Sequence, residues 1–298
     1  MITAILGLLT AVTYGAADFF AAIASRQIRV VTVTALASMS GLMVLVLLLP
    51  FMGGDFSEQA FFWGLMGGLS SVVALLALYA SLALGPISII SPLGALVSAI
   101  VPAVIGVSLL GESFSAIGWV AIALALIAVV LVGFVPPTSK NGEIVQMPKP
   151  RAILLAIIAG TGIGVAVTSL ARSPDDSGIA PIIVMRTTAA ILLGSVVLIT
   201  VLRNRKIKAG SFGRVEHGPI TSKIFLTIMA AGALDAGANI FFTLASRTGA
   251  LTVVGVLTAL YPLGTILLAR LVLKEHVATT QKIGIALTLS ASLLLALA

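Results

Sequence analysis

The sequence contains no cysteine, and charged residues make up only 9% of its 298 positions. The lack of cysteine excludes disulfide bonds and metal sites built from thiolates. Soluble domains carry roughly 25% charged residues, whereas 59% of this chain is hydrophobic. A soluble fold of this length could not bury so much apolar surface, so these scarcities predict an integral membrane protein.

Histidine is also scarce, and neither of the two histidines lies in an apolar stretch. His217 and His276 fall in polar connections, so a histidine-bound metal or a buried Ser–His pair is not available inside the membrane. We therefore expect no metal, no cofactor and no intramembrane enzyme. The formal charge of +7 and the pI near 10.2 come from Lys and Arg in short loops. That distribution sets membrane topology and argues against nucleic acid as a partner.

Long apolar stretches are what the chain has in abundance. A helix needs about 20 apolar residues to cross about 30 Å of hydrocarbon. Strands with open edges are excluded there because their backbone groups would lack partners. The sequence therefore predicts an all-α integral membrane protein with ten transmembrane helices. The predicted spans are 2–24, 30–51, 60–84, 87–110, 115–135, 152–171, 179–201, 223–246, 250–272 and 278–297.

Two similar segments divide the ten spans into two halves. LLGESFSAIGWVAIAL (109–124) and VLKEHVATTQKIGIAL (272–287) lie 163 residues apart, so that Glu112 aligns with Glu275. Each half then holds five spans, and because five is odd, the second half must enter the membrane inverted. The predicted units are a first five-helix repeat at 1–136, a linker at 137–150 and a second repeat at 151–298. Inverted repeats are typical of secondary transporters, whose binding site lies between the halves near the bilayer midplane.

Basic residues in the connections predict the orientation. We call the face that holds both termini side A and the opposite face side B. The side B connections contain thirteen Lys and Arg residues, and those of side A contain two, Arg172 and Arg247. By the positive-inside rule, side B is cytoplasmic and both termini face outward.

The repeat also carries a resemblance to a known family. Its paired "GE" and "KE" endings are each followed nine positions later by a small residue, Ala121 or Gly284. With the segment YGAADFFAAIASR (14–26) and the five-plus-five spans, these features resemble the EamA family of the drug/metabolite transporter superfamily. The resemblance covers the whole chain and implies ten helices around a central cavity, with export or exchange of small metabolites by alternating access. In that family both termini usually lie in the cytoplasm, opposite to the orientation that the loop charges predict.

Three ionisable residues lie well inside predicted spans: Asp18, Arg186 and Asp235. Charges inside a membrane are costly, so each is a candidate for function. Asp18 shares a helix face with Tyr14 and other polar residues at three- and four-residue intervals, and such a face points at protein or water rather than lipid. Two interpretations remain for Asp18: a cavity residue that binds a proton or a cationic substrate group, or a helix contact that reaches the headgroups near Arg26.

Asp235 and Asn239 lie four residues apart near the middle of the eighth span, and therefore on one face. A carboxylic acid at this depth suits proton coupling unless a cation balances it, and the alternative is a structural hydrogen bond between helices. Arg186 has three interpretations. It binds an anionic substrate group, it pairs with Asp235, or it extends toward the acids at 175–176 on side A, because long basic side chains reach for water.

Prolines occur at similar places in the fourth and ninth spans, including Pro102 and Pro262. Broken helices at matching places in two halves are typical of a transport site. Tyr261, beside Pro262, is suited to stack on a ring or to form a hydrogen bond with a carboxylate, and the alternative is an aromatic residue at the membrane interface. We interpret Glu112 and Glu275 as structural residues that favour the positive ends of the helices that follow them.

We therefore expect a multi-pass carrier in the plasma (inner) membrane, surrounded by membrane lipid, that exports amino acids or similar small molecules, with proton coupling as a hypothesis. Its cavity is predicted among spans 1, 3, 4, 6, 8 and 9, with spans 5 and 10 at the periphery. The predicted substrate- or proton-binding residues are Tyr14, Asp18, Arg186, Asp235, Asn239 and Tyr261. A lipid-like substrate is the alternative, a channel or an enzyme fits the sequence less well, and both a monomer and a homodimer are compatible with it.

Overall fold

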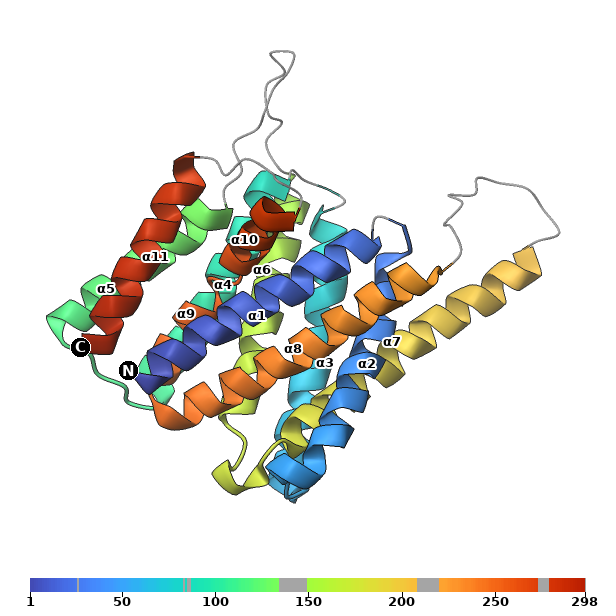
Figure 1. Cartoon of the computed structure of the whole chain (residues 1–298), viewed down its shortest axis with the longest axis horizontal. Coiled ribbons are helices and arrows are strands. Elements are labelled where there is room, and N and C mark those ends of the chain that lie inside the picture. Colours follow the sequence, from blue (N-terminus) through green and yellow to red (C-terminus); the bar gives the residue numbers. More distant parts are fainter. Residues whose placement is uncertain are drawn as a thin grey trace, which may run out of the picture.

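The structure contains helices and no strands within the residues it describes (Figure 1). It is a computed structural model that describes residues 1–25, 27–82, 84, 87–133, 149–207, 220–272 and 279–297. The elements are α1 (Ile2–Ser25), α2 (Val30–Met52), α3 (Glu58–Leu82), α4 (Ile87–Leu109), α5 (Ala116–Gly133), α6 (Pro150–Ala171), the 3-10 turn η1 (Asp175–Ser177), α7 (Ala180–Ile207), α8 (Ser222–Thr248), α9 (Leu251–Thr258), α10 (Pro262–Val272) and α11 (Thr279–Leu297).

The helices follow the predicted spans, and seven helical segments of the described residues are long and apolar enough to cross a membrane. They are α1, α2, Glu58–Leu78 of α3, α6, Ala180–Thr200 of α7, α8 and the stretch Leu251–Leu268. The prediction of a multi-pass membrane protein agrees with this result. Membrane crossing by α4, α5 and α11 stays a prediction.

The ninth predicted span is two helices rather than one. α9 ends at Thr258 and α10 begins at Pro262. Because proline has no N–H, Pro262 cannot bond the Thr258 carbonyl in the helical pattern. The N–H of Tyr261 donates to that carbonyl instead, at 3.0 Å, which makes a tight 3-10-like turn. The fourth span contains no such interruption, since α4 is continuous from Ile87 to Leu109, and a kink at its prolines stays a prediction. The ring of Pro102 packs on Gly255 of α9.

The first helices of the two halves run in opposite directions. Thr3, near the start of α1, donates a hydrogen bond to the Thr248 carbonyl at the end of α8, at 3.0 Å. Arg247, one residue before Thr248, donates to the carbonyls of Pro174 and Gly178, just after the end of α6. α1 therefore begins on the face where α6 ends, which is the arrangement of an inverted repeat.

α5 and α11 pack against each other at one end of the bundle, away from α2, α3 and α7 (Figure 1). The small residues of the repeat lie in this pair of helices. Ala121 is fully buried, and a Cβ added to Gly284 would lie 2.7 Å from Cγ2 of Val132. The repeated segments thus open two helices that pack closely on each other.

Glu112 holds the start of α9 rather than the start of α5. Its two carboxylate oxygens accept hydrogen bonds from the N–H groups of Leu251, at 2.5 Å, and Thr252, at 3.0 Å. A carboxylate at a helix N-terminus satisfies backbone donors that have no partner in the helix and favours the positive end of the dipole. Glu112 is structural, but its assignment to the helix that follows it is wrong, because packing brings a distant helix to its side chain. Glu275 lies outside the described residues.

Candidate functional site

A cavity of about 300 Å³ lies between the two halves. Residues from α1, α2, α3, α4, α6, α7, α8 and α9 line it, together with Tyr261 in the turn after α9. This set includes every span that the sequence predicted to line a cavity, and it adds α2 and α7, which the prediction omitted. Within the described residues, α5 and α11 contribute nothing to the lining, in agreement with their predicted peripheral place.

The fold brings all six predicted site residues to the wall of this cavity. They are Tyr14 and Asp18 on α1, Arg186 on α7, Asp235 and Asn239 on α8, and Tyr261 between α9 and α10. Their shared location agrees with the rule that charged residues within membrane spans face a protein interior or a water-filled space.

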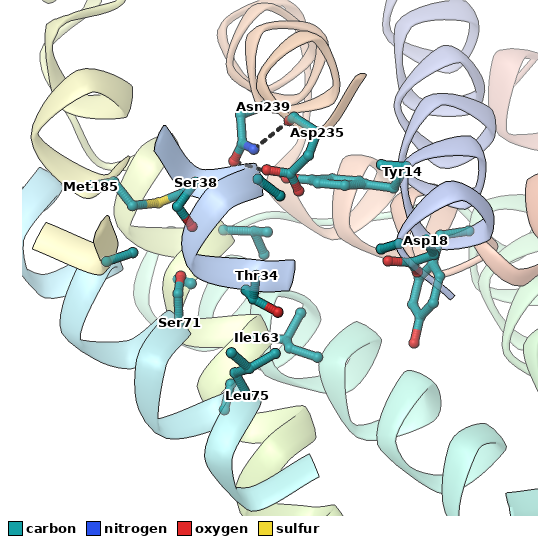
Figure 2. A pocket seen from close by; sticks show the side chains of 18 of the residues that line it. Tyr14, Asp18, Thr34, Ser38, Ser71, Leu75, Ile163, Met185, Asp235 and Asn239 are labelled. Atoms are coloured by element: carbon teal, nitrogen blue, oxygen red, sulfur yellow. Dashed lines mark hydrogen bonds between the residues drawn. The ribbon is translucent and has the colours of Figure 1, made fainter. Parts of the chain in front are cut away.

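Tyr14 and Asn239 tie α1 to α8 in the cavity wall (Figure 2). The Tyr14 hydroxyl donates to Oδ1 of Asn239 at 2.9 Å, and Nδ2 of Asn239 donates to the Asp235 backbone carbonyl at 2.7 Å. Asn239 is only 1% exposed, so these two bonds fix the orientation of its amide. A structural hydrogen bond between helices was the alternative interpretation of Asp235 and Asn239. The structure contains such a bond, and Asn239 makes it rather than the Asp235 side chain.

Arg186 forms an ion pair with Asp235 through its Nη2 atom, and the two side chains are 13% and 29% exposed. Of the three interpretations of Arg186, the structure shows the ion pair with Asp235. Extension toward side A is wrong for Arg186, and Arg247 occupies that place instead, with its Nε 3.7 Å from Oδ1 of Asp175. The pair cancels one positive and one negative charge inside the bundle, which lowers the cost of burying either alone.

Asp18 projects from α1 toward the cavity, one helical turn from Tyr14 (Figure 2). Among the described residues it forms no ion pair. Tyr14 and Tyr261 line the same cavity, so an acid and two tyrosines share its wall. With Arg186 and Asp235 balanced, the charged side chains of the lining leave one unbalanced negative charge, that of Asp18.

The turn between α9 and α10 is pressed against α1 beside these residues. A Cβ added to Gly15 would lie 2.3 Å from the Tyr261 carbonyl oxygen and 2.6 Å from Cα of Gly264. The Thr265 hydroxyl also donates to the Gly15 carbonyl at 3.1 Å. A residue without a side chain at position 15 permits this contact, and the contact holds Tyr261 in the cavity wall.

Several hydroxyl groups of the lining were absent from the sequence prediction. They are Thr34, Ser38 and Ser71. Ser98 and Thr258, on the two proline-containing spans that the sequence pointed to, line the cavity as well. A single hydroxyl in an apolar helix carries little signal, because Ser and Thr commonly bond the carbonyl three or four residues earlier. Ser71 does so with Gly67 and Ser98 with Ala95. Only the packed structure separates hydroxyls at the cavity from hydroxyls elsewhere.

The sequence matches the EamA-like transporter family over residues 1–134 and again over residues 150–297. The chain belongs to the EamA-like transporter family. The two successive matches correspond to two repeats, so the resemblance found in the sequence is confirmed. As an EamA-like protein, the chain is a multi-pass membrane protein of a transporter family.

Comparison with individual proteins shows that the fold is shared with a solved structure. Among curated proteins no match to this EamA-like chain was found. One solved structure, described only as "Crystal structure of protein", is similar with a TM-score of 0.74 and 18% sequence identity, over 99% of this chain and 96% of that chain. At this identity the likeness shows the fold alone, and it extends along the entire EamA-like chain.

Proposed function

We propose that this EamA-like protein is a secondary active transporter of the plasma (inner) membrane that exports amino acids or similar small metabolites by alternating access. The observation that carries the proposal is one cavity, between inverted halves, that collects the charged and polar residues of otherwise apolar helices. Carriers with inverted repeats bind their substrates at this place. A counterflow assay in proteoliposomes tests it, and absence of saturable exchange with every amino acid and metabolite pool would reject it.

Contacts between the halves on side A support a state that is closed toward that face. Each joins a residue of the first half to a residue of the second half. They are the hydrogen bond of Thr3 to Thr248 at 3.0 Å, that of Ile179 to Gly53 at 3.2 Å, and the bonds of Glu112 with Leu251 and Thr252. Rocking of one half against the other would have to break these contacts before the cavity could open to side A.

The positions of the lining residues show the depth of the cavity. α1 runs from side A to side B and contributes residues between Tyr14 and Ala21, in its second half. α2 runs the other way and contributes residues between Thr34 and Ser38, in its first half. α6 and α7, by contrast, contribute residues from their side A halves, Ile163–Val167 and Met185–Ala189. The cavity therefore lies around the middle of the bundle, where a carrier with inverted repeats binds its substrate.

We expect Glu112→Gln to favour opening toward side A. The neutral amide replaces a carboxylate that accepts two backbone N–H groups, and bonds to a charged acceptor contribute about 1.5–3 kcal/mol. Because the chain has no native cysteine, Ser98→Cys provides a single thiol in the cavity lining. A membrane-impermeant maleimide added at side A should label this thiol about tenfold faster in the Glu112→Gln background.

The matched control is Glu58→Gln, which removes an exposed acid in the first turn of α3, also on side A. It should leave the labelling rate unchanged, since Glu58 does not join the halves. Equal labelling rates in the Glu112→Gln and Glu58→Gln backgrounds would show that Glu112 does not hold side A closed.

For proton coupling, the geometry favours Asp18 over Asp235. Arg186 already balances the charge of Asp235. Asp18 has no such counter-ion among the described residues and faces the cavity, so a proton is the simplest species that could neutralise it. We therefore assign the coupling proton to Asp18 and a structural and substrate-positioning role to Asp235.

Asp18→Asn should remove the dependence of transport on a pH gradient, because the amide cannot exchange a proton. Asp235→Asn should lower transport at every pH through the loss of the ion pair, but leave the pH dependence in place. Uptake into proteoliposomes with and without an imposed pH gradient measures both effects. If Asp235→Asn abolished the pH dependence and Asp18→Asn retained it, the assignment would have to be reversed.

A further inference from the structure

The charged side chains of the cavity wall differ in how far a ligand can reach them. Asp18 is exposed, whereas the side chains of Asp235 and Arg186 are 29% and 13% exposed. The Nε atom of Arg186 is fully buried, and its Nη2 atom is paired with Asp235. Arg186 is the only basic residue in the described lining. The cavity therefore presents carboxylate oxygens to a ligand and holds back its one guanidinium.

Asp18 is the acid that the protein leaves without a partner. It forms neither an ion pair nor a hydrogen bond with the part of the chain that the structure describes. The polar groups around the cavity are committed elsewhere, since the Tyr14 hydroxyl donates to Asn239 at 2.9 Å and Arg186 pairs with Asp235. An acid inside a membrane protein is costly unless another charge balances it. For Asp18, that charge has to come from a species that enters the cavity.

Most of the remaining wall is apolar. Leu75 of α3, Ile163 of α6 and Met185 of α7 line the cavity (Figure 2). Moving an aliphatic group out of water against such side chains is favourable. The volume of about 300 Å³ lies at the lower end of the range for small-ligand sites. These properties suit a small ligand with an aliphatic body.

We infer that the cavity binds a small organic amine, with its ammonium group at the Asp18 carboxylate and its aliphatic body on the apolar wall. This inference rests on the proposed transport function and narrows its substrate class. A free carboxylate on the ligand is unfavourable, because it would meet Asp18 and Asp235 as like charges. An amino acid therefore binds less tightly than the amine that lacks its carboxylate. Either a proton or an ammonium group neutralises Asp18, so the assignment of the coupling proton to this residue stands.

Three probes with one carbon skeleton test which charge the cavity recognises. L-leucine carries both charges, 3-methylbutylamine lacks the carboxylate, and 4-methylpentanoate lacks the ammonium group. Isothermal titration calorimetry at neutral pH, on the purified full-length protein, should show the tightest binding for the amine. L-leucine should bind about tenfold more weakly, and 4-methylpentanoate should not bind. Ethylamine should bind at least tenfold more weakly than 3-methylbutylamine, because it buries fewer apolar groups.

Variants of Asp18 locate the ammonium group. Asp18→Asn keeps the shape of the side chain but removes its charge, and should weaken binding of 3-methylbutylamine at least tenfold. Asp18→Glu should restore most of it. Asp55→Asn is the matched control, because Asp55 is an exposed acid between α2 and α3 that does not line the cavity. It should bind the amine as the wild type does. The unfolding temperature of Asp18→Asn should not fall, since the variant removes an unpaired charge.

Equal binding of the amine and 4-methylpentanoate, undiminished amine binding by Asp18→Asn, an equal loss in Asp55→Asn, or no binding of the amine would each overturn the inference. The transport function has a separate readout. Saturable counterflow of substrates that lack an ammonium group, without counterflow of amines, would keep the proposed function and reject the amine site. Absence of counterflow with every metabolite pool would reject the function itself.

Discussion

Arg186→Gln should abolish transport and lower the free energy of unfolding by about 3–5 kcal/mol, the range for removing one partner of a buried ion pair. The reason is that Asp235, 29% exposed, would keep its negative charge inside the bundle without a counter-ion. Heat- or denaturant-induced unfolding of the purified protein in detergent measures the loss of stability, and counterflow measures the loss of transport.

The double variant Arg186→Gln/Asp235→Asn separates the cost of the unpaired charge from the function of the residue. With both charges removed, most of the stability should return, because two neutral amides can bond each other or water. Transport should stay absent, since the variant still lacks Arg186, a predicted substrate-binding residue. Equal stability of the single and double variants would contradict a stabilising ion pair, and full transport by the double variant would remove Arg186 from the site.

Gly15→Ala should have a similarly large effect, although it adds a single methyl group. The new Cβ would lie 2.3 Å from the Tyr261 carbonyl oxygen and 2.6 Å from Cα of Gly264. Both atoms belong to the backbone, so the helix and the turn must separate. Overpacking of this kind costs typically about 1–3 kcal/mol and occasionally more, and a contact between two backbones places it at the upper end. Transport should fall as well, because Tyr261 moves out of the cavity wall.

Gly194→Ala is the matched control for that substitution. Gly194 lies within α7, and a Cβ added there would meet nothing within 4 Å. Alanine stabilises a helix interior relative to glycine by roughly 0.5–1 kcal/mol. This variant should therefore have a slightly higher unfolding temperature than the wild type and should transport normally. A destabilised Gly194→Ala with an unaffected Gly15→Ala would contradict the packing of α1 on the turn after α9.

The charged residues of the site could be predicted because the membrane makes them conspicuous. Asp18, Arg186 and Asp235 stand within apolar helices, and the cost of exposing a charge to lipid directs each of them inward. The fold brings them to one cavity together with Tyr14 and Asn239, which share helix faces with these acids. The same argument does not work for Thr34, Ser38 and Ser71, because a hydroxyl in a helix can satisfy itself on its own backbone.

Helix breaks and caps were harder to predict because they depend on neighbours. Pro262 ends one helix and begins another, whereas Pro102 lies within a continuous helix, although both are prolines in apolar stretches. The difference lies outside the local sequence, in what packs on each residue. Glu112 is a second example. Its position before α5 predicted an interaction with the start of that helix, but its carboxylate accepts hydrogen bonds from the first turn of α9.

The sequence by itself determined the membrane setting, the presence of two repeats and the family, and it predicts five spans in each repeat and their relative inversion. These follow from hydropathy, from counting spans and from a repeated segment, none of which requires knowledge of contacts. The tertiary structure decided the pairings: Arg186 with Asp235 rather than with the acids of side A, Tyr14 with Asn239, and Glu112 with α9. Each pairing joins segments far apart in the chain, and helix packing, which no local pattern encodes, selects which of several suitable partners lies within reach.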